Sequence, residues 1–261
     1  ITCVINVLNS MLDMNVKNVA LSIMKSYIRR YWATDNDDEL HMNLRTTLQN
    51  FRQTLINGNT VGYTLNLTNQ IMVMLLMMEW PEKYPTLIPD LTNIDVSQQM
   101  LAYSNILLLA EIAELVQKQP PTVPSKAAFT NDIACIFQMI DRVVHLPMTK
   151  DFIKGIAKLL KMLCPLDPAD VLNSEATNFL IQHMMDNEVY KIEVLGLLGE
   201  LSLLPSLPQA FQSYFPSIFE TIIEKIQPDY DDKDKIRVLS EESSLILIKA
   251  ITSMIKRFTV A

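Results

Sequence analysis

Glycine is scarce in this chain, at only 5 of 261 residues. Rossmann folds, phosphate-binding loops and turn-rich β-proteins need glycine, because it takes positive φ without strain. The shortage therefore argues against these three classes. Leucine, isoleucine and methionine dominate instead, and straight-chain side chains lose little entropy in a helix. The composition predicts an all-α protein.

Basic charge is also in short supply. There are 22 Lys and Arg residues against 29 Asp and Glu, which gives a net charge of −7. Proteins that bind DNA or RNA normally carry a basic face. The sequence therefore predicts no direct nucleic-acid partner, whereas an acidic protein can attract a basic protein partner.

Cysteines are few, and long apolar runs are missing. Cys3, Cys135 and Cys164 are odd in number and scattered, which favours buried free thiols in a reducing compartment. The apolar run 71–78 is short, and no run reaches the roughly 18 residues expected of a membrane span. We therefore expect no membrane partner. The chain has no initiating Met and opens inside an amphipathic segment, so we expect it to be a piece of a longer protein.

Catalytic motifs are absent from the sequence as well. It has no Gly-x-Ser-x-Gly, HExxH or glycine-rich phosphate loop. His41, His145 and His183 each lack a second ligand at metal-binding spacing. We expect no enzyme activity, no catalytic residue, no cofactor and no metal.

What the chain does have is helical periodicity along its whole length, interrupted by short polar or proline-bearing breaks. The pattern predicts antiparallel helix pairs of roughly 43 residues each, the period of HEAT repeats. We expect one all-α solenoid segment over 1–261, with about six pairs that each cover the next. The expected helices are 2–13, 15–33, 37–57, 62–79, 83–93, 96–118, 125–146, 149–163, 168–185, 187–203, 206–227 and 236–258.

One corner of this array is marked by Glu-Trp-Pro. Pro81 cannot continue the helix before it, and it biases Trp80 away from the αR region. Pro85 suits the first turn of the next helix, where a missing N–H costs nothing. Trp80 is then left to cover the junction of two helices. These three residues are interpreted as architectural.

This corner also carries a resemblance. The segment 79–91, EWPEKYPTLIPDL, resembles the Glu-Trp-Pro-x-x-Trp-Pro segment of nuclear transport receptors of the importin-β (karyopherin) superfamily. The better match is the exportin branch, which includes the receptor for leucine-rich export signals. The segments 21–32, 132–140 and 215–226 are similar to further helices of that branch. Tyr84 departs from the pattern, because the family usually has a second Trp there.

The resemblance implies a nuclear export receptor that shuttles between nucleus and cytoplasm. It implies that Ran-GTP binds the inner surface of the N-terminal HEAT repeats, together with cargo proteins that carry nuclear export signals, and that nucleoporins are partners. The family's groove for export signals lies in later repeats, beyond this chain. Asn69 matches a family position on a helix of the Ran-binding region.

The residues themselves add two candidates. Lys25 and Arg29 lie four positions apart and share a helix face. They form either an ordinary solvated face or a contact with an acidic patch of a small GTPase. Two other functions stay open: an importin or a different exportin with the same GTPase, and a HEAT scaffold without a GTPase partner.

Overall fold

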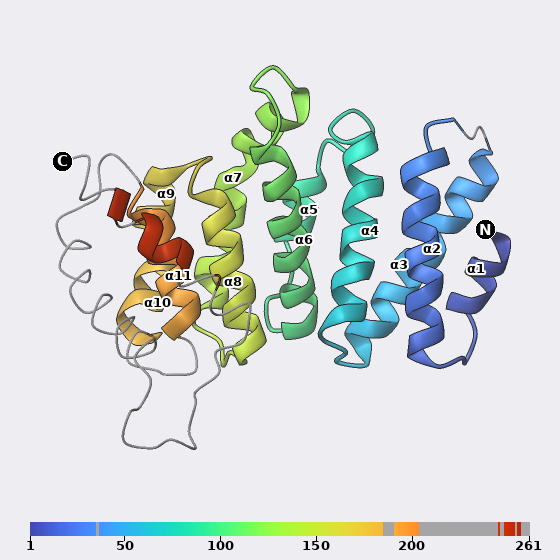
Figure 1. Cartoon of the computed structure of the whole chain (residues 1–261), viewed down its shortest axis with the longest axis horizontal. Coiled ribbons are helices and arrows are strands. Elements are labelled where there is room, and N and C mark those ends of the chain that lie inside the picture. The colour runs from blue at the N-terminus through green and yellow to red at the C-terminus, as the bar shows by residue number, and fades with distance from the viewer. Residues whose placement is uncertain (35–36, 185–190, 204–244, 246–247, 254, 257–261) are drawn as a thin grey trace. The chain divides into compact units, whose positions relative to one another are not determined.

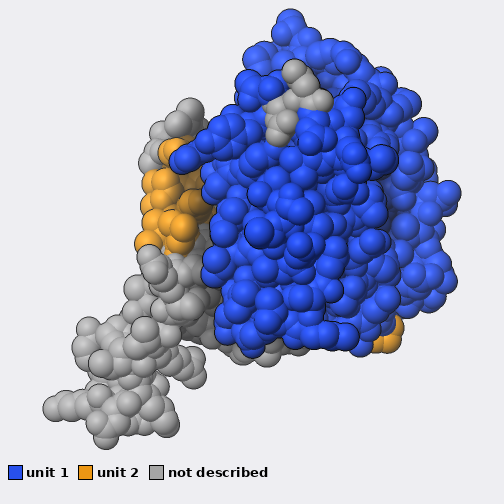
Figure 2. Space-filling view, turned by 90° about the vertical axis from the view of Figure 1, so that its right-hand side faces the viewer, with its two compact units in different colours: residues 1–146 blue, residues 147–261 orange. Residues whose placement is uncertain are grey.

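The described part of the chain is helical. In the computed structural model it comprises residues 1–34, 37–184, 191–203, 245, 248–253 and 255–256, and these residues form α-helices and connecting turns without a strand. The prediction of an all-α protein is confirmed. The chain divides into two compact units, 1–146 and 147–261 (Figure 2).

Unit 1 is built from helices that stack side by side. Its helices are α1 (Thr2–Leu8), α2 (Met14–Tyr31), α3 (Asp38–Asn57), α4 (Tyr63–Glu79), α5 (Leu87–Thr92), α6 (Gln99–Gln117) and α7 (Pro124–Val143). In Figure 1, α2, α4 and α6 lie next to one another in one layer, and α4 contacts both its neighbours. Helix α3 contacts α1, α4 and α6 from a second layer. Neighbouring antiparallel pairs of this kind confirm the predicted α-solenoid class.

The core of unit 1 is concentrated in α4 and α6. Most side chains of these two helices are buried, including Leu65 and Ile71 on α4 and Ile106, Leu109 and Ile112 on α6. Helix α6 is long and apolar enough to cross a membrane by length and composition alone. Most of that stretch is buried inside the protein, as expected of a helix with packed neighbours on several sides.

The Trp-Pro corner ends α4. Trp80 has an extended backbone, with ψ of 141°, because Pro81 follows it, and the bond between them is cis. The indole is 4% exposed and meets the ring of Phe129 on α7 edge-on, with centroids 6.5 Å apart. The expected place of Pro85 is wrong: α5 begins at Leu87, two residues later. Pro89 takes the first-turn role instead, at the third residue of α5, where no intrahelical donor is lost.

Unit 2 contains α8 (Lys150–Leu163), α9 (Pro168–Asn173), α10 (Glu175–Met184) and α11 (Lys191–Leu201) among its described residues. The single helix expected over 168–185 is broken at Ser174, which is extended and whose Oγ accepts the N–H of Ala176. A serine that caps the next helix ends the previous one. The expected helix 206–227, the similar segment 215–226 and most of 236–258 lie outside the described residues.

Helix α11 approaches residues 248–253 very closely. A Cβ added at Gly199 would lie 2.6 Å from the Cα of Ala250. Glycine is therefore required here by packing, although the position is helical.

We predict that Gly199→Ala destabilises unit 2. In a helix, alanine is more favourable than glycine by roughly 1 kcal/mol. A clash with the backbone of Ala250 costs about 1–3 kcal/mol of folding free energy, which outweighs that gain. Urea unfolding followed by far-UV circular dichroism measures the loss. The control is Gly58→Ala, where the nearest atom is 3.3 Å away. Equal effects of the two substitutions would contradict the packing argument.

The cysteines differ in exposure. All three are free, but Cys3 is exposed, Cys135 is intermediate and only Cys164 is buried. The expectation of three buried thiols is therefore wrong for Cys3, which lies on the short helix α1, and Cys135 is only half-buried. Burial, and then the charge of Glu200, raise the pKa of the Cys164 thiol to about 12.

Alkylation should separate Cys3 from Cys164. The thiolate is the reactive form, so we expect iodoacetamide at pH 8 to modify Cys3 quickly and Cys164 only when unit 2 unfolds. Peptide mass spectrometry over a time course measures both rates, with 8 M urea as the fully reactive control. Similar rates for the two thiols in native buffer would rule out the buried position of Cys164.

Candidate functional site

The predicted residues Lys25 and Arg29 lie on α2, whose first turn is capped by the side chain of Asp13. Lys25 Nζ donates to Gln70 Oε1 of α4 at 2.6 Å, so Lys25 links two neighbouring helices. Arg29 is exposed in the last turn of α2, where a cation interacts favourably with the helix C-terminus. Arg29 is thus available to a partner, and the Lys25 ammonium is partly buried.

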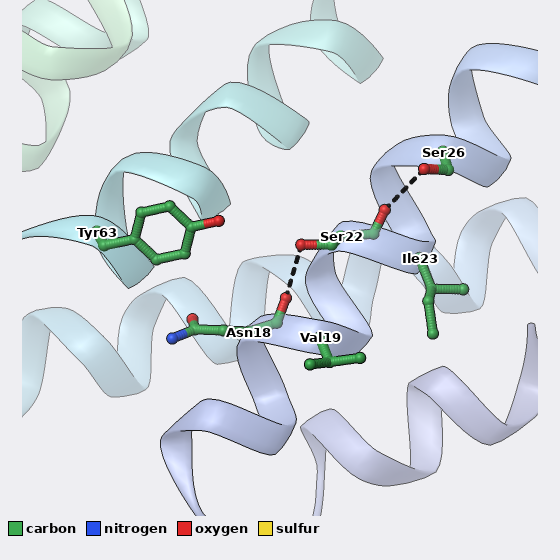
Figure 3. Close-up of a pocket in the computed structure, with 6 residues that line it drawn as sticks. All are labelled: Asn18, Val19, Ser22, Ile23, Ser26 and Tyr63. Carbon is green, nitrogen blue, oxygen red and sulfur yellow. Dashed lines mark hydrogen bonds between the residues drawn. The ribbon is translucent and has the colours of Figure 1, made fainter.

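A shallow hollow lies beside these residues between α2 and the start of α4 (Figure 3). Its volume is about 420 Å³, and it is lined by Asn18, Val19, Ser22, Ile23, Ser26 and Tyr63. Figure 3 shows Ser22 Oγ donating to the Asn18 carbonyl and Ser26 Oγ donating to the Ser22 carbonyl, at 2.9 and 3.0 Å. The serine donors are therefore used within their own helix. Val19, Ile23 and Tyr63 leave an exposed apolar surface, and we call this hollow with Lys25 and Arg29 the α2–α4 face.

Asn69, the third predicted residue, does not reach that face. It is 1% exposed. Its Oδ1 accepts from Arg52 Nε at 3.0 Å and from Ser104 Oγ at 3.3 Å, and its Nδ2 donates to the Ser104 carbonyl at 3.3 Å. Asn69 therefore holds α4 to α3 and α6, and its amide is not presented to solvent.

A second asparagine completes this network. Asn105 Oδ1 of α6 accepts from Arg52 Nη2 at 2.6 Å, and Asn105 Nδ2 donates to the Leu91 carbonyl of α5 at 2.9 Å. We call Arg52, Asn69, Ser104 and Asn105 the Arg52 cluster. It joins α3, α4, α5 and α6, which belong to two successive helix pairs.

The Arg52 cluster contains a cation without a carboxylate. No salt bridge forms at Arg52 among the described residues, and its two side-chain acceptors are neutral amide oxygens. Burial lowers the pKa of Arg52 to about 10, so the guanidinium stays charged at neutral pH. A half-buried charge compensated only by amide dipoles is an expensive arrangement.

The other arginine on this face of α3 is neutralised. Arg45 pairs with Glu79, the residue before Trp80, and Lys83 approaches the same carboxylate at 3.3 Å. Arg45 also lies over the ring of Trp32 at 5.2 Å, and Trp32 stacks on His41 at 3.8 Å. This group ties the ends of α2, α3 and α4 together.

Sequence reasoning missed Arg45 and Arg52. A signal was present: they are seven residues apart on one helix, so they share a face. Asn69 and Asn105 each stand in a helix in which most positions are apolar. A buried asparagine must find partners, and this predicts a polar cross-link between the helices that carry it.

We predict that Asn69→Ala and Asn105→Ala each lower the free energy of unfolding of unit 1 by about 1–3 kcal/mol, because a charged N–H loses its acceptor while it stays buried. Both tryptophans of the chain lie in unit 1, so their fluorescence during urea unfolding reports on this unit. The control is Asn66→Ala on the exposed side of α4. If all three variants unfold at the same urea concentration, the cluster does not stabilise the fold.

Comparison with known proteins gives one relevant similarity. No protein-family model matches the chain. Exportin-1 of Schizosaccharomyces pombe (strain 972 / ATCC 24843) is 20% identical to it over 244 residues, which cover 87% of the chain. The chain spans 22% of the length of that relative. Together with the stacked helix pairs, this similarity supports a distant relationship to the karyopherin and HEAT-repeat proteins.

Proposed function

We propose that the chain is a segment of a nuclear export receptor and that it binds the small GTPase Ran in its GTP form. The observation that carries the proposal is the similarity to an exportin-1 along 87% of the chain. The Glu-Trp-Pro corner supports the same proposal. These residues carry the family resemblance, they end α4, and their tryptophan, Trp80, is buried.

The α2–α4 face is the proposed contact for the GTPase. It combines the exposed Arg29 with the Lys25 ammonium and the apolar side chains of Val19, Ile23 and Tyr63. Protein interfaces commonly join apolar side chains with a few cations at the rim. Charged rim residues mainly accelerate association with an oppositely charged patch, so this face suits an acidic surface on the GTPase.

Asn69 takes an indirect role in this proposal. Because it is buried, it acts through the α3–α4–α6 packing and not by touching the GTPase. Trp80, Pro81 and Pro85 set the path of the chain from α4 to α5 and are architectural in the same sense.

The mechanism is binding linkage. In a stacked helical array, small rotations between repeats add up along the molecule. If Ran-GTP favours the same arrangement that cargo with an export signal favours, each ligand raises the affinity for the other. GTP hydrolysis in the cytoplasm then releases both. In this proposal cargo with an export signal binds later repeats of the receptor, nucleoporins are further partners, and the receptor moves between nucleus and cytoplasm.

Charge reversal on the α2–α4 face tests the proposal. We predict that Lys25→Glu combined with Arg29→Glu weakens binding to Ran loaded with a non-hydrolysable GTP analogue by about tenfold or more. The two substitutions replace cations by anions, which repel an acidic surface on the GTPase. Biolayer interferometry with immobilised Ran measures the affinity, and circular dichroism checks the fold. The control is Lys150→Glu, an exposed residue at the start of α8.

Three results would count against the proposal. Equal binding of the GTP and GDP forms would indicate a scaffold without a nucleotide-sensitive partner. An equal loss in the Lys150→Glu control would indicate non-specific attraction. Wild-type affinity in the double variant would contradict the proposed contact of the GTPase with Lys25 and Arg29.

A further inference from the structure

We propose that Arg52 is a receptor for one carboxylate, supplied by an Asp or Glu side chain of a partner protein that docks on unit 1. The inference does not depend on the identity of that partner and holds whether or not it is a GTPase. It rests on the donors that remain on the guanidinium, the rigidity with which it is held, and its missing counter-charge.

Free donors remain on Arg52. A guanidinium has five N–H groups. Nε donates to Asn69, and one N–H of Nη2 donates to Asn105. This leaves one N–H on Nη2 and both on Nη1, for which the described residues offer no acceptor.

Arg52 is half-buried, and its Nη1 is open to solvent. Arg45 Nε is among the buried polar atoms that have no partner, but no atom of Arg52 is. Because Nη1 has no acceptor and is not enclosed, it must be reachable from outside the protein. A carboxylate that approaches the end of the guanidinium can accept one N–H from each Nη atom, which is a two-point geometry specific to arginine.

The guanidinium is held in place before any ligand arrives. Asn69 fixes its Nε side from α4, and Asn105 fixes Nη2 from α6. Asn105 is itself anchored to the carbonyl of Leu91, and Asn69 is held by Ser104. A side chain that is already ordered loses little conformational freedom on binding. The entropic cost of binding a carboxylate is therefore small on the Arg52 side of the contact.

The charge selects a carboxylate over a phosphate group. The cluster supplies one positive charge, and the two amide oxygens that accept from it repel a dianion more strongly than a monoanion. The chain as a whole carries a net charge of −7, which disfavours polyanions further. One carboxylate neutralises the single charge of Arg52 and leaves no excess charge.

The test uses the wild-type protein with ¹⁵N-labelled arginine. N-acetyl-glutamate amide is titrated at constant ionic strength, and the Nε–H resonances are followed by NMR. The Arg52 peak is identified by its loss in Arg52→Lys. We expect a saturable chemical-shift change of this peak, half-maximal at a probe concentration of about 10–100 mM, because the probe makes a single charge-assisted contact. The exposed Arg30 is the internal control and should not shift in a saturable way.

Two matched probes make the result specific. N-acetyl-glutamine amide has the same shape without the charge, and we expect no saturable shift with it. Inorganic phosphate at the same ionic strength should bind more weakly than the glutamate probe. The inference is overturned if Arg52 does not respond to the glutamate probe, if the glutamine probe acts equally, if phosphate binds more tightly, or if Arg30 responds in the same way.

Discussion

Unit 1 depends on the lateral burial of α4 and α6. Each of these helices contacts helices of its own layer and of the second layer, so most of its side chains are removed from water. A helix in this position cannot use one apolar stripe and one polar face. Any buried polar side chain on it must find a partner inside the protein, because an unpaired buried polar group is costly. The positions of such side chains therefore determine how neighbouring pairs are fastened to each other.

The polar residues of α4 and α6 meet that requirement in two ways. Thr68 satisfies itself locally, by donating to the Thr64 carbonyl one turn earlier at 2.8 Å. Asn69, Ser104 and Asn105 cannot be satisfied within their own turn, and they reach α3, α5 and each other instead. A hydrogen bond within the same helix allows a polar side chain such as Thr68 to be buried without an unpaired donor. The long-range bonds give the stacking a defined register, because a slide of one helix by one residue would separate donors from acceptors.

The sequence predicts the regular parts of this arrangement well. Helix periods and proline breaks place α2, α3, α4, α7 and α8 within a few residues, since these signals act over neighbouring residues only. The start of α5 is missed because either Pro85 or Pro89 could stand in a first turn, and the choice depends on how the chain turns after Trp80. The Arg52 cluster is missed for a different reason. Its members are up to 53 residues apart, and periodicity carries no information on such contacts.

The two arginines of α3 show that the sequence pattern of one helix does not predict which partners its side chains have. Arg45 and Arg52 share a face, a helix and a direction, yet Arg45 meets Glu79 and the ring of Trp32, whereas Arg52 meets two amides. The difference is created by α4 and α6, which bring a carboxylate to one and asparagines to the other. An arginine paired within the fold fastens helices together and has no charge to offer. An arginine held by neutral groups keeps its charge and its free donors, so it is the one that a partner can use.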